Sequence, residues 1–235
     1  MTALKGSVAL VTGASRGIGA ATARALAIQG VDLGLASRSG DNLGLREAVA
    51  RPCDVRNLDE VEAMVASVVE RFGKLDILVA NAGVGAYGDF LDLDRRWLDE
   101  IVDINVKGLL YCVRAALPHL LESDRGELLT VASIAGQHGP KGEAVYSASK
   151  FAQVGFMRSI DHELWDRGVR CSTICPGGVA TDFAMGRGRT LDMPHLAAMM
   201  SPEEVAEAVL FALARPRTQR VLEAAILPMG EASMG

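Results

Sequence analysis

Short apolar runs alternate with longer segments of helical period from one end of the chain to the other. This alternation is typical of βαβ units, in which helices cover both faces of a parallel sheet. The predicted strands are Ser7 to Thr12, Val31 to Ala36, Ala50 to Asp54, Leu75 to Ala80, Glu127 to Ser133, Val169 to Cys175 and Ala224 to Pro228. The pattern therefore predicts an α/β fold with a parallel seven-stranded sheet flanked by helices.

Local signals mark helix ends between these strands. Asn57 followed by Glu60 resembles a capping box, and Gly73 after Phe72 predicts the end of that helix. The segment Ser201 to Glu204 is a second start signal, because it combines a hydroxyl cap, a proline suited to the first helical position and two acids facing the positive end of the helix dipole.

Pro52 falls inside the third predicted strand. Proline cannot donate to a central ladder, so this strand is expected at an edge of the sheet. An edge position fits a doubly wound Rossmann fold with the strand order 3-2-1-4-5-6-7. No internal repeat or linker interrupts the chain, so one nucleotide-binding domain over residues 1–235 is predicted, with a substrate loop at about 177–200.

The segment Thr12 to Gly19 follows the first strand directly and opens an alanine-rich helix. Glycine lets the main chain turn tightly and approach a pyrophosphate, whose charge is attracted by the free N–H groups and dipole of the helix start. A glycine triplet alone is also compatible with a tight turn and close helix packing. The strand before it and the helix after it favour phosphate binding.

The end of the second strand carries Ser37 and Arg38, where an NAD-preferring site places an acidic residue for the ribose hydroxyl. Arg38, together with Arg16 in the glycine turn, favours a ribose 2′-phosphate. NADP(H) is therefore the preferred cofactor and NAD(H) remains possible. The alternative is that both arginines are solvated surface charges.

Tyr146 and Lys150 stand four residues apart, so on a helix their side chains share one face. A tyrosine with an ordinary pKa of about 10 exchanges protons near neutrality only if positive charge stabilises its phenolate. The ammonium of Lys150 and an oxidised nicotinamide ring can together supply that charge. Ser133 ends the fifth predicted strand at the carboxyl edge, where its hydroxyl can hold a substrate carbonyl beside Tyr146.

In this combination the sequence resembles the short-chain dehydrogenase/reductase family from Ser7 to about Met229. The motifs that carry the resemblance occur in order: Thr12 to Gly19, Asp54, Asn81-Ala82-Gly83, Asn105, Ser133, Tyr146 with Lys150, and Pro176-Gly177 leading to Thr181. The chain departs from the family pattern at Ala80, where a first asparagine is usual, and in the short segment Gly40 to Val49, which leaves room for only about two helical turns.

The resemblance implies catalytic roles for four residues. Ser133 orients the carbonyl, Tyr146 is the acid/base, Lys150 binds the nicotinamide ribose and tunes Tyr146, and Asn105 supports a proton-relay water. The implied cofactor-binding residues are Gly13, Ser15, Arg16, Gly17, Ile18, Gly19, Arg38, Ser39, Asp54, Val55, Asn81, Ala82, Gly83, Tyr146, Lys150, Pro176, Gly177, Val179 and Thr181. Structural alternatives remain open: Asn105 as the cap of a helix distortion, Pro176-Gly177 as a strand end and Asp54 as a turn residue.

The substrate pocket is expected after the strand ends, from Val84 to Tyr87, Ile134 to Pro140, Gly178 and the loop Phe183 to Met200. The methionines of that loop, among them Met193, suit an adaptable apolar pocket or simply fill the core. Arg187 and Arg189 are interpreted as residues of a solvated loop rather than an anion site. His138 is interpreted as a surface or packed residue rather than a substrate contact.

The formal net charge of -5 makes a nucleic-acid partner a poor expectation, and no apolar run is long enough to span a membrane, so a cytoplasmic protein is predicted. Cys53, Cys112, Cys171 and Cys175 form no metal-binding motif, so no metal is expected, although Cys171 and Cys175 share a strand face.

The composite prediction is an NADP(H)-dependent oxidoreductase that interconverts a carbonyl and a primary or secondary alcohol. The alternative is a non-catalytic NADP(H)-binding sensor or scaffold on the same fold. A serine hydrolase is disfavoured because Ser133 lacks the Gly-x-Ser-x-Gly elbow. The resemblance further implies a homodimer or homotetramer, with apolar faces of the helices around residues 98–121 and 146–165 buried between subunits.

Overall fold

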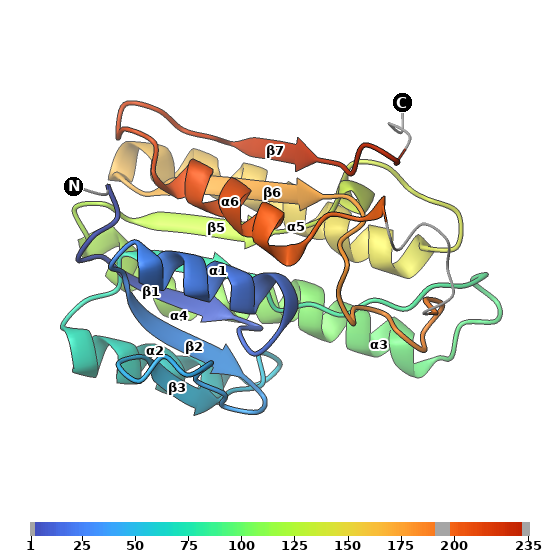
Figure 1. Ribbon diagram of the computed structural model, residues 1–235, viewed down its shortest axis with the longest axis horizontal. Helices are drawn as coiled ribbons and strands as arrows, with labels where there is room; N and C mark the ends of the chain where they lie inside the picture. Colours follow the sequence, from blue (N-terminus) through green and yellow to red (C-terminus); the bar gives the residue numbers. More distant parts are fainter. Residues whose placement is uncertain (1–2, 191–197, 232–235) are drawn as a thin grey trace.

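The computed structural model describes residues 3–190 and 198–231. Within them seven strands pair in parallel in the order β3-β2-β1-β4-β5-β6-β7 (Figure 1). The strands are β1 (Val8–Thr12), β2 (Asp32–Ser37), β3 (Val49–Pro52), β4 (Ile77–Ala80), β5 (Glu127–Val131), β6 (Arg170–Pro176) and β7 (Glu223–Ile226). The predicted doubly wound fold and its strand order are confirmed.

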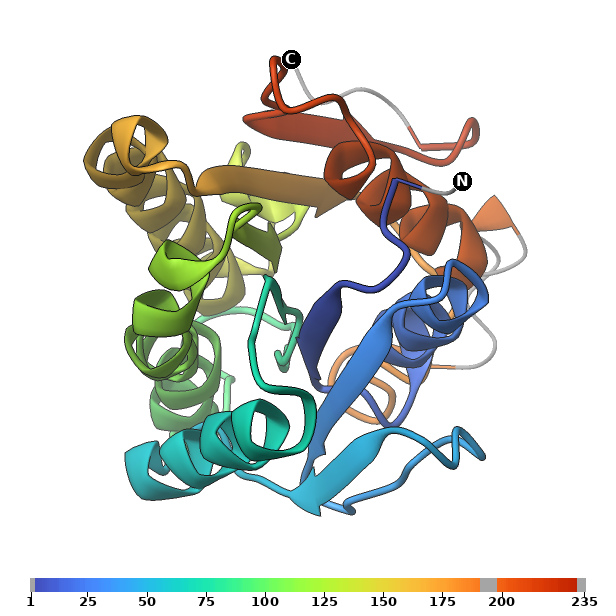
Figure 2. The same cartoon turned by 90° about the vertical axis from the view of Figure 1, so that its left-hand side faces the viewer.

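Helices cover both faces of this sheet. They are α1 (Gly17–Ile28), α2 (Leu58–Phe72), α3 (Arg96–Val102), α4 (Gly108–Glu122), α5 (Ala144–Leu164) and α6 (Pro202–Leu213), with a π-helical segment η1 (Asp103–Lys107) and two short 3-10 segments, η2 (Ile134–Gly136) and η3 (Trp165–Arg167). Figure 2 shows α1 and α6 on one face and α2, α4 and α5 on the other.

The strands β1 to β6 supply both hydrophobic layers, because successive side chains point to opposite faces. Val8 and Leu10 of β1 belong to the layer beneath α2, α4 and α5. Ala9 and Val11 belong to the layer beneath α1 and α6. Burial on both faces explains why the strands appear in the sequence as continuous apolar runs rather than as alternating ones.

The predicted helix ends are confirmed, but Asn57 and Glu60 do not form a reciprocal capping box, because Glu60 accepts from the Asn57 side chain and from the Asp54 N–H. Asn57 caps α2 by accepting a hydrogen bond from the Asp59 N–H, and Gly73 ends that helix with a φ of 79°. Ser201 and Glu204 form a complete capping box at the start of α6. Pro52 lies in β3, which is an edge strand, as its missing N–H predicts.

The segment 40–48, for which the sequence leaves room for about two helical turns, contains no helix. Gly40, Leu43 and Gly44 have φ angles of 68°, 56° and 76°. A right-handed helix cannot continue through such left-handed positions, so the main chain turns instead. The observed strand ends differ from the predicted ones by one or two residues. The clearest case is β5, which ends at Val131 because Ser133 caps η2.

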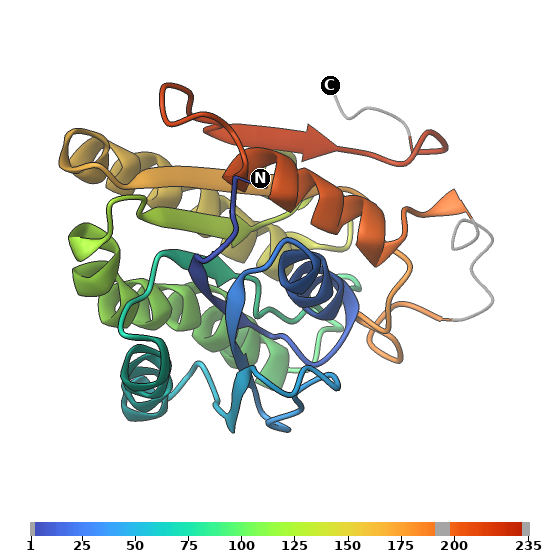
Figure 3. The same ribbon diagram turned by 60° about the vertical axis from the view of Figure 1, so that its left-hand side comes forward.

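All strands point the same way, so the segments that follow them gather beyond one edge of the sheet, where the chain after β6 also lies (Figure 3). Open sheets of this type place ligands at that edge. None of the described helices is long and apolar enough to cross a membrane.

A buried ion pair joins β5 and β6 at the amino ends of the strands, opposite the edge at which ligands are expected. Glu127 and Arg170 are 1% and 5% exposed, and Arg170 Nε donates to Glu127 Oε1 at 2.9 Å. Arg170 also donates to the main-chain carbonyls of Leu213, Arg215, Pro216 and Gln219. One guanidinium therefore joins the strand starts to the segment after α6.

We expect Arg170→Met to lower the free energy of unfolding by about 3 kcal/mol, because it strips a buried carboxylate of its main partner. Urea unfolding measures this loss. The double variant Glu127→Leu/Arg170→Met should lose less than Arg170→Met alone, because no buried charge is left, and exposed Arg114→Met is the control. Equal stability of Arg170→Met and the wild type would contradict a structural role for the pair.

Candidate functional site

A cavity of about 1140 Å³ opens at the carboxyl edge of the sheet. Its walls come from the turn after β1, the ends of β2 to β6, the first two turns of α5 and the segment 176–189. The predicted residues that line it are Gly13, Ser15, Arg16, Gly17, Ile18, Arg38, Asp54, Val55, Asn81, Ala82, Gly83, Ser133, Tyr146, Lys150, Pro176, Gly177, Val179 and Thr181. Three other predicted residues do not line it: Gly19 and Asn105 lie behind the lining, and Ser39 is exposed outside it.

The glycine turn forms one end of the cavity. Gly13 and Gly17 have φ angles of 65° and 54°, which favour glycine, and a Cβ on Gly13 would lie 2.9 Å from Ala82 Cα. At the start of α1, Arg16 makes no side-chain cap and the first turn holds no acidic residue. The positive end of the helix therefore faces the cavity uncompensated by a side chain, and this cradle fits the pyrophosphate of a dinucleotide.

Asn81 fixes the turn against the chain that follows β4. Its Nδ2 donates to the Thr12 carbonyl at 2.9 Å, while the Thr12 Oγ1 accepts from the N–H groups of Asn81 and Ala82 at 3.1 and 3.0 Å. A Cβ on Gly19 would clash with the Gly13 carbonyl oxygen. Gly19 thus shapes the cradle from behind.

Two arginines face the cavity beside the ends of β1 and β2. Arg16 and Arg38 are exposed, and neither forms an ion pair with any described residue. Asp54 is held by Arg56, and the hydrogen bond from that guanidinium lowers the pKa of the Asp54 carboxyl below its ordinary value. The Ser39 hydroxyl lies 3.2 Å from that of Ser37, outside the cavity wall.

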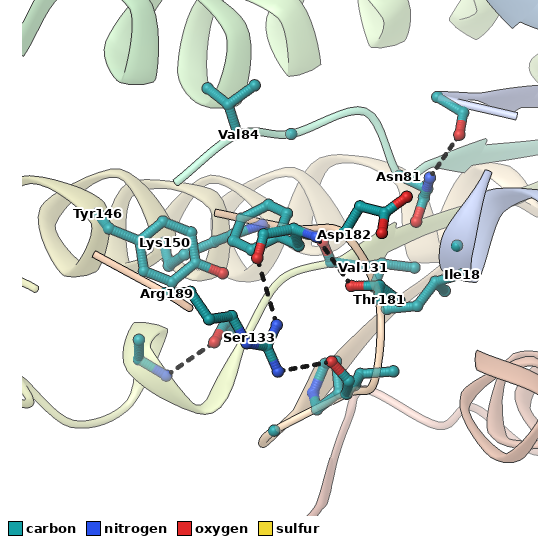
Figure 4. Close-up of a pocket in the computed structure, with 18 of the residues that line it drawn as sticks. Ile18, Asn81, Val84, Val131, Ser133, Tyr146, Lys150, Thr181, Asp182 and Arg189 are labelled. Atoms are coloured by element: carbon teal, nitrogen blue, oxygen red, sulfur yellow. Dashed lines mark hydrogen bonds between the residues drawn. The ribbon is translucent and has the colours of Figure 1, made fainter. Parts of the chain in front are cut away.

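Ser133, Tyr146 and Lys150 meet at the other end of the cavity (Figure 4). They are 8%, 6% and 3% exposed. The Lys150 Nζ lies 5.7 Å from the centroid of the Tyr146 ring and donates to the Val131 carbonyl at 3.2 Å. Helical spacing places Tyr146 and Lys150 on one face of α5, and the end of β5 brings Ser133 to them.

Burial dominates the electrostatics of these groups. It raises the pKa of the Tyr146 phenol above its ordinary value, against the opposing effects of the Ser133 hydroxyl and the Arg189 guanidinium. Burial also lowers the pKa of Lys150 to about 8. The site by itself therefore disfavours a phenolate at Tyr146. The sequence interpretation, which assigned the stabilising charge to Lys150 and an oxidised nicotinamide ring, missed the contribution of Arg189.

Asn105 is fully buried in η1 and supports the cavity wall from behind. Its Oδ1 accepts from the Val84 N–H at 2.8 Å, and its Nδ2 donates to the Val84 carbonyl and the Ser149 Oγ at 2.9 Å each. Its main-chain carbonyl accepts from Gln153 Nε2 at 2.7 Å, and Gln153 Oε1 accepts from Lys150 Nζ at 2.9 Å. The sequence interpretation missed Gln153, whose position three residues after Lys150 was the available signal.

Aromatic rings enclose the substrate end of the cavity. The Tyr146 ring centroid lies 5.7 Å from that of Tyr87 and 5.6 Å from that of Phe183. Glu143, one turn before Tyr146, also lines the cavity, and burial followed by the nearby charge of Glu231 raises the pKa of its carboxyl to about 7. The sequence interpretation missed both carboxylates.

Arg189 contradicts the expectation of a solvated loop. It is 6% exposed and donates to the carbonyls of Val179 at 2.9 Å and Phe183 at 3.3 Å (Figure 4). These bonds form because the segment after β6 folds back on itself, which no local pattern predicts. Arg187 is half-buried and stacks over Trp97 at 4.8 Å, while His138 is half-buried and lies outside the cavity wall.

The remaining expectations for the loop are met in part. Met199 lines the cavity, whereas Met193 lies outside the described residues. Within residues 3–190 and 198–231, no group of three or more histidine, cysteine, aspartate or glutamate residues is arranged to hold a metal ion.

Comparisons with known proteins agree with this geometry. A family model described as short chain dehydrogenase matches residues 7–192. The chain is 38% identical to an uncharacterized oxidoreductase of Staphylococcus haemolyticus over 97% of this chain and all of the relative. It is 36% identical to a 3-oxoacyl-[acyl-carrier-protein] reductase of Synechocystis over 92% of each chain.

Among solved structures, an alcohol dehydrogenase of the archaeon Thermococcus sibiricus complexed with 5-hydroxy-NADP superposes with a TM-score of 0.87 at 31% identity, covering 97% of this chain and 99% of the other. Fold, motifs and relatives thus coincide over nearly the whole chain. The chain belongs to the short-chain dehydrogenase/reductase family.

Proposed function

We propose that the protein is an NADP(H)-dependent oxidoreductase that interconverts a carbonyl group and a primary or secondary alcohol, with Tyr146 as general acid/base. The observation that carries the proposal is that Ser133, Tyr146 and Lys150 line the same cavity as the glycine turn of α1. A relative that reduces 3-oxoacyl groups and a similar structure named as an alcohol dehydrogenase support this reaction class.

Each of the three side chains has a distinct task in this proposal. The Ser133 hydroxyl donates to the substrate oxygen and holds it beside Tyr146. Tyr146 donates its phenolic proton to that oxygen during reduction and accepts it during oxidation. Lys150 holds the ribose of the cofactor and contributes positive charge. A bound nicotinamide supplies or accepts the hydride and adds positive charge when oxidised.

The proton transfer needs a lower pKa at Tyr146 than the unliganded site provides. A shift of about three pKa units from the ordinary value of a tyrosine corresponds to about 4 kcal/mol of differential stabilisation. Burial acts against this shift, and Arg189 and Ser133 act in its favour. Positive charge brought by the cofactor must supply the remainder, so we expect Tyr146 to be reactive only in the cofactor complex.

We also propose one domain over residues 1–235 and a homodimer or homotetramer. All seven strands join one sheet, which supports a single domain. Leu110 on α4 and Phe151 on α5 are 38% and 47% exposed, and Trp165 just after α5 is 56% exposed. These apolar side chains lie on the helices expected between subunits.

The cofactor preference depends in this proposal on Arg38 and Arg16, which form no ion pair with any described residue. Arg38→Asp removes a guanidinium that can hold a 2′-phosphate and adds an acid that can hold a ribose hydroxyl. We expect the ratio of NADPH to NADH affinities to fall at least about tenfold. Equilibrium fluorescence titration measures both affinities, and Arg24→Asp on the exposed face of α1 is the control. An unchanged ratio would refute the preference.

The role of Tyr146 is tested with Tyr146→Phe, which removes the proton donor and keeps the ring. We expect kcat to fall by a factor of about 1000, with NADPH affinity within about twofold of the wild type. NADPH absorbance is followed with aldehydes, ketones, 3-oxoacyl thioesters and, in reverse, 3-hydroxy acids. Tyr111→Phe on α4 is the matched control. Tight NADPH binding without any turnover that depends on Tyr146 would instead identify a cofactor sensor.

A further inference from the structure

Gln153 lies one helical turn beyond Lys150 on α5 and is 3% exposed. Both ends of its amide are used. Its Oε1 accepts from Lys150 Nζ at 2.9 Å, and its Nε2 donates to the main-chain carbonyl of Asn105 at 2.7 Å. The amide therefore connects the buried ammonium of α5 to the π-helical segment that precedes α4.

The carbonyl at the far end of this connection lies in an unusual stretch of helix. In η1 the hydrogen bonds span five residues, as in the bond from the Gly108 N–H to the Asp103 carbonyl. Single π-helical turns of this kind occur frequently at functional sites. The side chain of Asn105 holds the Val84 main chain at 2.8 and 2.9 Å. Gln153 thus connects Lys150 to the residue that fixes the cavity wall.

The Lys150 ammonium is stabilised by hydrogen bonds to neutral acceptors. Its Nζ bonds to Gln153 and, at the longer distance of 3.2 Å, to the Val131 carbonyl. Among the described residues no carboxylate lies within ion-pair distance of it. The titratable groups that face it are Tyr146 on its own helix and the buried thiol of Cys175 on β6.

We propose that Gln153 is a positioning residue for the reaction: its amide holds the Lys150 ammonium in place and keeps it charged, and it touches neither substrate nor cofactor. Gln153 contacts neither substrate nor cofactor in this proposal, because it does not line the cavity that holds Ser133 and Tyr146. The proposal rests on the proposed function insofar as it assigns Lys150 a role in that reaction.

The energetic reason is that burial works against the lysine charge. Burial already lowers the pKa of Lys150 to about 8. A hydrogen bond accepted from the charged form favours that form, so removing the acceptor lowers the pKa further. Because an ammonium loses its charge as pH rises through its pKa, any step that needs charged Lys150 would then fail at a lower pH.

The first test reads Lys150 directly by NMR titration of the full-length protein carrying 13C-labelled lysine. The chain has five lysines, and Lys5, Lys74, Lys107 and Lys141 are exposed, so the buried Lys150 signal stands apart and Lys150→Arg assigns it. Gln153→Met keeps the size of the side chain and removes both hydrogen bonds. We expect the pKa of Lys150 to fall by about one unit.

Two further variants separate this effect from general damage. Gln153→Glu retains an oxygen that accepts from Lys150, so it should return the pKa to the wild-type value or above it. Gln137→Met changes a glutamine whose amide contacts Glu223 instead, and it should leave the pKa unchanged. If Gln153→Met does not fold, the smaller apolar variant Gln153→Leu serves for the same test.

Kinetics then tests the consequence for the reaction. In Gln153→Met the basic limb of the kcat/KM profile should move to lower pH by about one unit, and Gln153→Glu should reverse the shift. A purely structural role would lower activity alike at every pH. An unchanged Lys150 pKa in folded Gln153→Met would overturn the proposal.

The NMR result does not require turnover, so the two proposals fail separately. A shifted Lys150 pKa in a protein without any carbonyl reduction would support the connection through Gln153 and refute the proposed function. Turnover that depends on Tyr146 together with an unaffected Lys150 would support the proposed function and refute the role of Gln153.

Discussion

Two stretches of main chain meet between β1 and β4, and the cavity is built around their contact. Thr12 accepts hydrogen bonds of 2.9 to 3.1 Å from Asn81 and Ala82 there, and Gly13 approaches Ala82 so closely that a Cβ would not fit. The chain after β1 leaves toward one face of the sheet and the chain after β4 toward the other, which opens a crevice for a ligand. Glycine is required here because only it combines the positive φ with the close approach.

At the far end of the cavity, burial makes charge costly, and the surrounding hydrogen bonds decide which charges persist. Burial raises the pKa of Tyr146 and lowers that of Lys150, so each group is pushed toward its neutral form. Gln153 and the Val131 carbonyl compensate the lysine, whereas Tyr146 has only partial compensation. Lys150 is therefore stabilised in its charged form before a ligand binds, whereas the pKa of Tyr146 depends on the charge of the bound ligand.

The two ends of the cavity carry different charged groups. Arg16 and Arg38 line the end beside β2, where they form no ion pair with the described residues. At the substrate end, Glu143 and Glu231 lie near the buried Arg189, and the pKa of Glu143 is raised to about 7 by burial first and by Glu231 second. A carboxyl is mostly charged only above its pKa, so the charge of Glu143 at the substrate end changes near neutrality.

The sequence by itself determined the alternation of strands and helices, the edge position of Pro52, the glycine turn and the pairing of Tyr146 with Lys150. Each of these follows from a local rule: the period of apolar residues, the missing N–H of proline, the freedom of glycine or the geometry of one helical turn. Only the tertiary structure decided that Arg189 is buried, that Glu143 lies near Glu231 and that Gln153 connects Lys150 to Asn105. These contacts join residues that are distant in the chain or lie in irregular segments, where no local spacing records the partner.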